Sequence, residues 1–287
     1  MNIFQVLDRN SKIARLIRET TGECWVSPFF CNTRLHVRPR IICEASWSRV
    51  LSNAVLNRMF PPERDTIELD HYTKFAGFEG IVSSGQLRLY WIRKRVSEHE
   101  ITSFAAAHRL QGYVSTNNRS PVYIEISEEL FYCSFTRPGA GNEQQLWNDF
   151  GGNDRGVRLR FRLTPGAADL RPMYYEGRKP TLLATLNEQL ETETGRIFLP
   201  HSISKICAFY LPLGYQDEAE VRLLLKKTPH LSGWGFDGYD EYCAVPIDQK
   251  NPICALNLVR IAPGNKADRQ AIVDVLSRSQ FSSVPVT

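Results

Sequence analysis

The chain has 287 residues, enough for one large domain or two small ones. Hydrophobic residues make up 43% of it and charged residues 23%, a balance typical of globular proteins that can bury a sizeable core. The net charge of +4 and the pI near 8.7 are only mildly basic, which falls short of the bias of a dedicated nucleic-acid binder but permits a phosphate-bearing substrate.

The N-terminus and the cysteines indicate a compartment. Met1 to Phe4 is not a basic region leading into an apolar run, and no stretch approaches the roughly 18 uncharged apolar residues of a membrane span. The cysteines are odd in number and include no C-x-x-C pair, which disfavours structural zinc and suits reduced thiols. We therefore expect a cytoplasmic protein with no signal peptide and no membrane association.

Residues 1–62 are predicted to form a helical N-terminal region. Apolar side chains recur at near-helical spacing over residues 4–17 and again over residues 44–59, and Pro61-Pro62 then ends the second pattern. Two interpretations fit these amphipathic patterns. The favoured one is a helical cap on the main domain, and the other is a segment that binds a partner or regulates activity.

Residues 63–287 are predicted to form one α+β catalytic domain. The predicted strands are residues 67–73, 87–92, 122–127, 129–136, 157–163, 203–211, 219–225, 242–247 and 256–262. The predicted helices are residues 74–85, 98–112, 143–150, 180–194 and 265–277. Because short strands mix with helices without a strict βαβ alternation, we expect a mainly antiparallel sheet with flanking helices.

Two carboxylates on a predicted strand are the first candidates for chemistry. Glu218 and Glu220 lie two residues apart, so on a strand their side chains point the same way. Close carboxylates raise the pKa of one of the pair, which suits stabilising a cationic transition state and accepting a proton. Arg222 extends the same face. The competing and commoner interpretation is a solvated face carrying a Glu–Arg surface pair.

A second group of polar residues ends the first strand of the predicted domain. His71, Tyr72 and Thr73 place an imidazole and two hydroxyls at the mouth of a strand, where they can hold a polar ligand. Alternation along the strand implies that either His71 or Tyr72 is buried. Ser134 offers a hydroxyl from another predicted strand. Structural roles compete here too, since a single histidine often has only a hydrogen-bonding role.

Several familiar signatures are missing from the sequence. Its glycines form neither a G-x-G-x-x-G fingerprint nor a Walker loop, and there is no G-x-S-x-G elbow. There is also no H-E-x-x-H motif or dense His/Glu cluster, so we expect no metal at the site.

The order of short motifs resembles an uncharacterised bacterial domain family with the pattern HYT, SFS, LW-x-x-Y, G-V and E-x-E-x-R. The resemblance covers roughly residues 66–275. The segments that carry it are His71-Tyr72-Thr73, Cys133-Ser134-Phe135-Thr136, Leu146 to Phe150, Gly156-Val157 and Glu218 to Arg222. This chain departs from that family in one respect, because the Asn-Asp-Pro-x-Glu stretch usual after the second strand is not found here and residues 117–121 are only the nearest segment to it.

The same order of parts is similar to the ADP-ribosyltransferase superfamily, which surrounds NAD with residues from a split sheet. The resemblance implies that His71 touches the nicotinamide ribose or amide with Thr73 beside it, and that Tyr72 can stack on nicotinamide. It implies that Ser134 supports the site, that Glu220 is the catalytic glutamate and that Glu218 orients or deprotonates the acceptor. Arg222 belongs to the same NAD-binding set.

The function expected from this resemblance is NAD-dependent transfer of ADP-ribose to a macromolecule. The acceptor is a protein or a nucleic acid, and the context is that of a toxin, an effector or a phage-defence component. Two alternatives remain open at the level of sequence. One is an NAD glycohydrolase, and the other is a non-enzymatic module that binds a nucleotide or a protein on the same fold. The sequence leaves the oligomeric state open.

Overall fold

The computed structural model describes residues 3–92, 98–110, 129–139, 142–177, 180–228 and 232–287. The chain divides into two compact units. Unit 1 comprises Met1–Pro61, Val96–Ser127 and Tyr174–Pro212, and unit 2 comprises Pro62–Arg95, Glu128–Met173 and Leu213–Thr287. Within the described ranges, no helix is both long and apolar enough for a membrane crossing.

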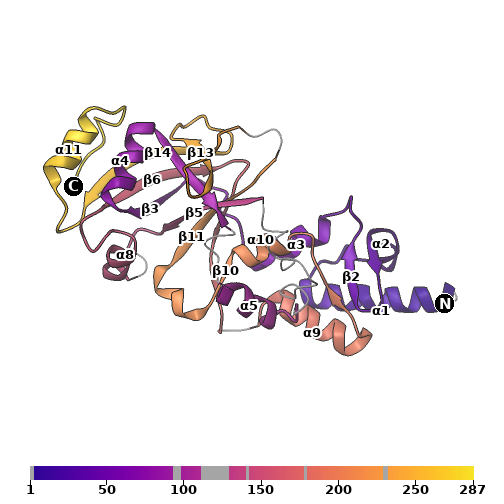
Figure 1. Ribbon diagram of the computed structural model, residues 1–287. Helices are drawn as coiled ribbons and strands as arrows, with labels where there is room; N and C mark the ends of the chain where they lie inside the picture. Colours follow the sequence, from indigo (N-terminus) through magenta and orange to yellow (C-terminus); the bar gives the residue numbers. More distant parts are fainter. Residues whose placement is uncertain (1–2, 93–97, 111–128, 140–141, 178–179, 229–231) are drawn as a thin grey trace. The chain divides into compact units, whose positions relative to one another are not determined.

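Unit 1 is mostly helical (Figure 1). Its described helices are α1 (Ile3–Thr21), α2 (Pro28–Arg34), α3 (Val50–Met59), α5 (Glu98–Ala107), α9 (Leu182–Thr194) and α10 (Ile203–Ala208). Its strands are β1 (Leu35–Val37), β2 (Ile41–Glu44), β8 (Tyr174–Tyr175), β9 (Ile197–Phe198) and β10 (Tyr210–Leu211). Strands β1 and β2 form an antiparallel hairpin, and β9 extends it by pairing in parallel with β2.

The core of unit 1 forms where α9 contacts both α1 and α3. Ile13 and Ile17 recur four residues apart on α1, and Leu183 and Leu190 lie one heptad apart on α9, so each pair occupies one face of its helix. All four side chains are 0% exposed. The amphipathic N-terminal helix is therefore packed within its own unit.

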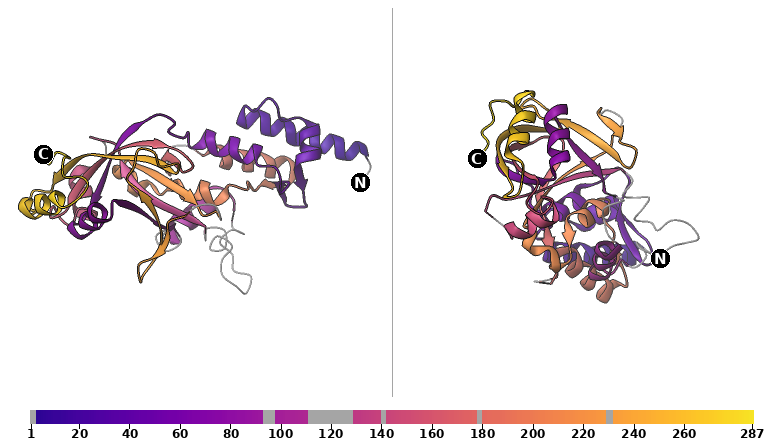
Figure 2. Two further views of the ribbon diagram at one scale, coloured as in Figure 1. Left: turned by 90° about the horizontal axis from the view of Figure 1, so that it is seen from above. Right: turned by 60° about the vertical axis from the view of Figure 1, so that its left-hand side comes forward.

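Unit 2 is built on one curled sheet with helices on its outside (Figure 2). Its strands are β3 (Ile67–Thr73), β4 (Gln86–Trp91), β5 (Leu130–Thr136), β6 (Val157–Pro165), β7 (Asp169–Pro172), β11 (Glu220–Lys226), β12 (Trp234–Phe236), β13 (Glu241–Pro246) and β14 (Cys254–Pro263). Its helices are α4 (Phe75–Ser84), α8 (Glu143–Asp149) and α11 (Arg269–Ser277), with a 3-10 turn at Leu213–Glu218. All pairings between these strands are antiparallel.

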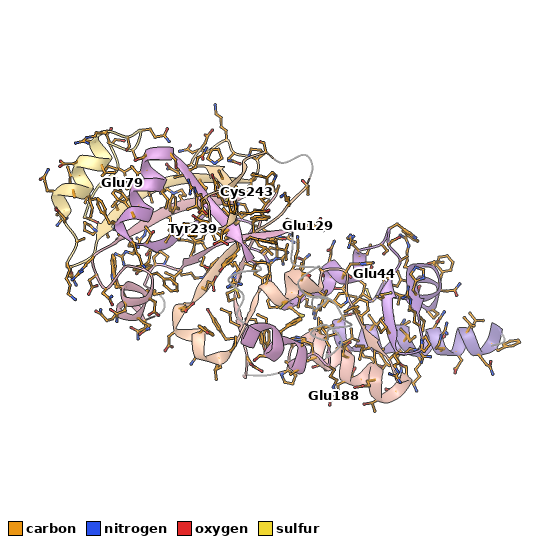
Figure 3. The ribbon with its side chains drawn as sticks, in the orientation of Figure 1. Glu44, Glu79, Glu129, Glu188, Tyr239 and Cys243 are labelled. Atoms are coloured by element: carbon orange, nitrogen blue, oxygen red, sulfur yellow. The ribbon has the colours of Figure 1, made fainter. Side chains whose placement is uncertain are left out.

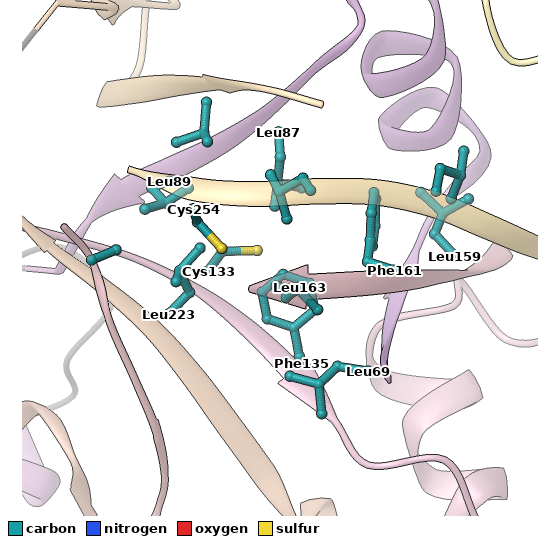
Figure 4. Close-up of a cluster of buried hydrophobic side chains, with 14 of the residues drawn as sticks. Leu69, Leu87, Leu89, Cys133, Phe135, Leu159, Phe161, Leu163, Leu223 and Cys254 are labelled. Carbon is teal, nitrogen blue, oxygen red and sulfur yellow. The ribbon is translucent and has the colours of Figure 1, made fainter. Parts of the chain in front are cut away.

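The sequence explains which face of this sheet becomes the core. Strand β6 alternates apolar residues with three arginines, and its apolar residues are all 0% exposed. They join the alternate apolar positions of β3, β5, β11 and β14 in one buried cluster, part of which is shown in Figure 4. The opposite face of β3, β5, β6 and β11 carries most of their charged side chains, because successive strand residues point to opposite sides, while His71 and Thr73 share the side of Leu69.

Helices α4 and α11 pack against each other beside the sheet (Figure 1). Helix α4 connects β3 to β4 and ends at Gly85, whose φ of +67° is the left-handed conformation typical of a helix C-terminus. The mixed α+β class, the mainly antiparallel sheet and the flanking helices are as predicted from the sequence.

Residues 203–211 do not form the strand that the sequence predicts. They form α10 followed by the two-residue strand β10. Ile203, Ile206 and Cys207 are buried at the i, i+3 and i+4 spacing of a helix, and this periodicity prevails over the β-branched composition of the segment.

The helix predicted over residues 44–59 begins only at Val50. Glu44 ends β2 instead, and its buried carboxylate accepts hydrogen bonds from Leu51 N at 2.9 Å and Ser52 N at 2.8 Å (Figure 3). This side chain caps the first turn of α3 from a distant sequence position, which a local helical pattern does not reveal.

The N-terminal region also differs from its predicted form. Residues 1–61 contribute the β1–β2 hairpin as well as helices, and they share their compact unit with Val96–Ser127 and Tyr174–Pro212. The latter two segments had been assigned to the catalytic domain. The strand predicted at residues 122–127 lies outside the described residues.

Candidate functional site

The sheet of unit 2 divides along one edge of β5. Strand β11 pairs with β5 over its full length, from Lys226 opposite Leu130 to Glu220 opposite Thr136. On the other edge, β4 pairs only with Phe131 and Tyr132, and β3 pairs only at Thr136. Among the described strands, none therefore pairs with residues 133–135 of β5 on that edge.

A cavity of about 650 Å³ opens at this division. Strands β3, β4 and β5, one face of α4, the second half of α8, Glu218 just before β11 and Glu220 at its start all contribute to its lining. The volume lies within the roughly 300–1,000 Å³ typical of small-molecule sites. Of the residues singled out from the sequence, it brings together His71, Tyr72, Thr73, Ser134, Glu218 and Glu220.

His71 spans the division of the sheet. Its Nδ1 lies 2.9 Å from the carbonyl oxygen of Ser134 on the unpaired edge of β5. Because a carbonyl accepts, Nδ1 carries the proton, and Nε2 is left as an acceptor with no partner among the described residues. Burial lowers the pKa of His71, and the hydrogen bond to Ser134 only partly opposes that effect. The imidazole is thus neutral at pH 7.

Glu220 is held by two neighbours on the polar face of the sheet. Its carboxylate receives a bidentate pair from Arg222, with Nε at 2.8 Å from Oε1 and Nη2 at 3.0 Å from Oε2. Ser134 donates its hydroxyl to Oε1 at 2.5 Å. Glu220 is 5% exposed, and the Arg222 guanidinium, itself covered by the Tyr132 ring at 4.6 Å, holds the carboxylate in one orientation.

Glu218 does not share the strand with Glu220, contrary to the sequence interpretation. It ends the 3-10 turn, and Ala219 between them has a φ of +46°, which breaks the alternation of side chains. Thr136 fixes this turn by donating its hydroxyl to the carbonyl oxygen of Glu218 at 2.9 Å. A left-handed alanine costs about 1 kcal/mol or more, so the strain that brings Glu218 to the cavity is sustained by its surroundings.

Tyr72 and Thr73 occupy the two sides of β3. The Tyr72 ring is 9% exposed and makes an edge contact with Trp147, with the ring centroids 5.0 Å apart. Burial raises the pKa of its hydroxyl, which accepts a hydrogen bond from Arg158 at 3.4 Å. Little of the ring is left for stacking on a ligand. Thr73 packs closely on Gly77, where an added Cβ would lie 2.1 Å from the Thr73 hydroxyl oxygen.

Arg222 also differs from its predicted role. Its guanidinium is 5% exposed and bound to Glu220, and it is not part of the cavity wall. It positions the Glu220 carboxylate.

A buried acid that the sequence interpretation missed is Asp70. It is 1% exposed, it lines the cavity, and it receives a bidentate pair from Arg160 at 2.7 and 2.9 Å. The hydrogen bonds that Arg160 donates to Asp70 raise the pKa of Arg160. In the register of β3 with β6, Asp70 lies opposite Arg160 and Glu68 lies opposite Arg162. These complementary charges in two alternating segments were the signal that could have revealed the pair.

Aromatic residues in the wall were missed as well. Tyr90 and Tyr132 come from β4 and β5, and Phe150, at the end of α8, is 42% exposed. Their rings are of the kind that contacts a planar ligand. Nothing in their local sequence distinguishes them from core residues, because what places them at the cavity is the division of the sheet.

The seven thiols are all free, and no group of three His, Cys, Asp or Glu side chains in the described ranges is arranged to hold a metal ion. Comparisons of the chain with protein-family models, with characterised proteins and with solved structures find no match. The geometry of the cavity is therefore the basis for a functional assignment.

Proposed function

We propose that unit 2 binds NAD in the cavity of its divided sheet and transfers ADP-ribose to a macromolecular acceptor, as the likeness to ADP-ribosyltransferases implies. The observation that carries the proposal is the placement of Glu220. Its carboxylate lies at the cavity beside the opening between β3 and β5, and Arg222 and Ser134 hold it in one orientation. On this proposal the divided sheet corresponds to the split sheet of that superfamily.

The chemistry follows from the charges. The bond between the nicotinamide nitrogen and C1′ of the ribose breaks, nicotinamide leaves with the electron pair, and positive charge spreads over C1′ and the ring oxygen. The Glu220 carboxylate stabilises that charge, as carboxylates do in glycoside hydrolysis. The neutral His71 offers Nε2 as an acceptor for a ribose hydroxyl or the carboxamide. The acceptor nucleophile then attacks C1′, and Glu218 takes its proton.

A second candidate function, binding of a nucleotide without catalysis, is favoured by one observation. Glu220 is only 5% exposed and forms its ion pair within the chain. Such a pair can serve the fold alone. NAD hydrolysis is a variant of the first proposal, in which water replaces the acceptor.

Release of labelled nicotinamide from NAD by the full-length protein separates these functions. Glu220→Gln keeps the size of the side chain but removes the charge opposite the developing cation, so we expect the rate to fall about a hundredfold or more. Glu241→Gln is the matched control, because Glu241 forms only an exposed surface pair with Lys227. Saturable NAD binding by the wild type without release would favour the binding function, and absence of both would sink the proposal.

Glu218 provides the second arm of the same experiment. If it deprotonates the acceptor, Glu218→Gln retains nicotinamide release but transfers little label to a macromolecule. Equal loss of both activities would show that Glu218 and Glu220 act together in cleavage and that the acceptor role is wrong.

A further inference from the structure

The excess positive charge of the protein is confined to unit 1. Lysine plus arginine equals aspartate plus glutamate in unit 2, so the net charge of +4 comes entirely from the other unit. Within unit 1, residues 1–61 are the basic part, where basic residues outnumber acidic ones by more than two to one. A net charge that is modest for the whole chain is therefore concentrated in a small region.

Three arginines meet at the turn of the β1–β2 hairpin. Arg38 and Arg40 flank the turn and are exposed. Arg196 precedes β9, which pairs in parallel with β2, and its Nε donates to the carbonyl oxygen of Arg38 at 3.0 Å. Ile197 N donates to the carbonyl oxygen of Arg40 at 3.1 Å. The backbone thus fixes all three at one end of the hairpin.

The other end of the hairpin carries a tryptophan stacked by an arginine. The guanidinium carbon of Arg34 lies 4.1 Å from the centroid of the Trp47 ring, and Trp47 is 62% exposed. Exposed Arg49 follows two residues later. The strands between the two ends are three or four residues long, which places the ends roughly 10 Å apart at about 3.3 Å per residue. This separation is about one Debye length, so the charges at the two ends act together on a ligand.

In the described part of the chain, no carboxylate lies within ion-pair distance of these five arginines, which are Arg34, Arg38, Arg40, Arg49 and Arg196. The acids of the neighbouring α9 are already paired elsewhere. Glu193 contacts Lys12 and Arg15 on α1, at 3.4 and 2.8 Å. Glu188 and Glu191 both contact Arg109. The only acid of the hairpin itself, Glu44, is buried and caps α3.

We propose that single-stranded nucleic acid binds at the β1–β2 hairpin of unit 1. The binding surface comprises Arg34, Arg38, Arg40, Trp47, Arg49 and Arg196. Unpaired guanidinium groups bind phosphates, and arginine is preferred over lysine where planar, bidentate contacts to phosphate form. Trp47 presents a ring face on which a base can stack, while Arg34 supports the other face. Between residues 34 and 50 the large apolar side chains that are exposed, Ile41, Trp47 and Val50, lie among four arginines, and an anionic membrane would be met better by a continuous apolar face.

Fluorescence anisotropy of labelled single-stranded oligonucleotides of mixed sequence, one DNA and one RNA, tests this surface with the full-length protein. Arg38→Ala combined with Arg40→Ala is expected to weaken binding about tenfold or more and to lower the slope of log affinity against log salt by about 1.4. Trp47→Ala is expected to weaken binding by about five- to a hundredfold with a smaller change in the salt slope, because base stacking is not screened.

The matched control is Arg155→Ala combined with Arg278→Ala, two exposed arginines of unit 2 that carry no ion pair in the described residues. This variant removes the same charge but is expected to keep nearly wild-type affinity. Equal weakening by the two double variants would mean non-specific charge attraction and would overturn the proposal. So would absence of oligonucleotide binding, or binding only to vesicles rich in phosphatidylserine. DNA and RNA binding equally, or RNA alone, both support it.

Discussion

The polar strands of unit 2 and the β1–β2 hairpin of unit 1 use arginine in opposite ways. In unit 2, every arginine on β6, β7 and β11 has a carboxylate partner on the same or the neighbouring strand or on α8. At the hairpin of unit 1, Arg38 and Arg40 are exposed at the turn, and no acid is within ion-pair distance of them among the described residues. Paired arginines order a sheet face and a cavity wall, while unpaired ones leave a positive field available to a ligand.

The ion pairs on the strands of unit 2 differ in how deeply their side chains are buried. Asp70 and Arg160 form a bidentate pair in which the acid is 1% exposed, whereas both side chains of the neighbouring Glu68–Arg162 pair are well exposed. Burial, not the number of contacts, should decide how much each pair contributes to stability.

The largest effect is expected for Asp70→Asn. Loss of the buried charge leaves Arg160 without its partner and should lower the free energy of unfolding of unit 2 by about 3 kcal/mol. Glu68→Gln, the control on the same strand and face, should cost less than about 1 kcal/mol. Urea unfolding monitored by circular dichroism measures both. Equal costs would mean that depth does not distinguish the two pairs.

The next effect concerns the buried His108 of unit 1. Its Nε2 lies 2.6 Å from the Thr181 hydroxyl oxygen, and burial lowers its pKa from 6.5 to about 4. His108 is therefore protonated below about pH 6.5 in the unfolded chain, but only below about pH 4 in the folded chain. The stability contributed by neutral His108 is present above pH 6.5 and is lost as the pH falls, by up to about 3 kcal/mol at pH 4.

Thermal unfolding of the wild type and His108→Gln between pH 7 and pH 4 measures this difference. The stability gap between the two should shrink as the pH falls. His36→Gln, which alters an exposed histidine of the hairpin, should follow the wild-type pH profile. A gap that stays constant with pH would contradict the assignment of a neutral His108.

The smallest of these effects separates the two nitrogens of His71. An asparagine at this position keeps a donor near Nδ1 for the Ser134 carbonyl but has no group at the place of Nε2. We expect His71→Asn to leave the melting temperature nearly unchanged and to weaken NAD binding about tenfold, or about 1.4 kcal/mol. Calorimetric titration with NAD measures the affinity. Unfolding of the variant, or unchanged affinity, would assign His71 to structure alone.

Much of the fold of unit 2 was predictable, because its strands alternate and its helices end at clear signals. The run Val157 to Leu163 predicted a half-buried strand, and Gly85 predicted the end of α4. The division of the chain into units was not predictable. It depends on contacts between α1 and α9, which lie far apart in the sequence, and on a cap that Glu44 provides across six residues.

The candidate site was predictable in its residue types and less so in its geometry. His71, Ser134 and Glu220 do meet at one cavity, but the strand alternation assumed for Glu218 and Glu220 fails at Ala219. A backbone conformation that is rare for alanine leaves no signal in the sequence. The basic surface of unit 1 was missed for a related reason, since the net charge of a whole chain conceals how its charges are distributed.

The crystal structure of the Glu220→Gln variant with bound NAD tests the central claim most directly, because the variant should retain the cofactor uncleaved. We expect NAD in the cavity between β3 and β5, with the nicotinamide ribose near position 220 and a contact to Nε2 of His71. NAD bound elsewhere, or a cavity that stays empty at saturating NAD while the variant is folded, would contradict it.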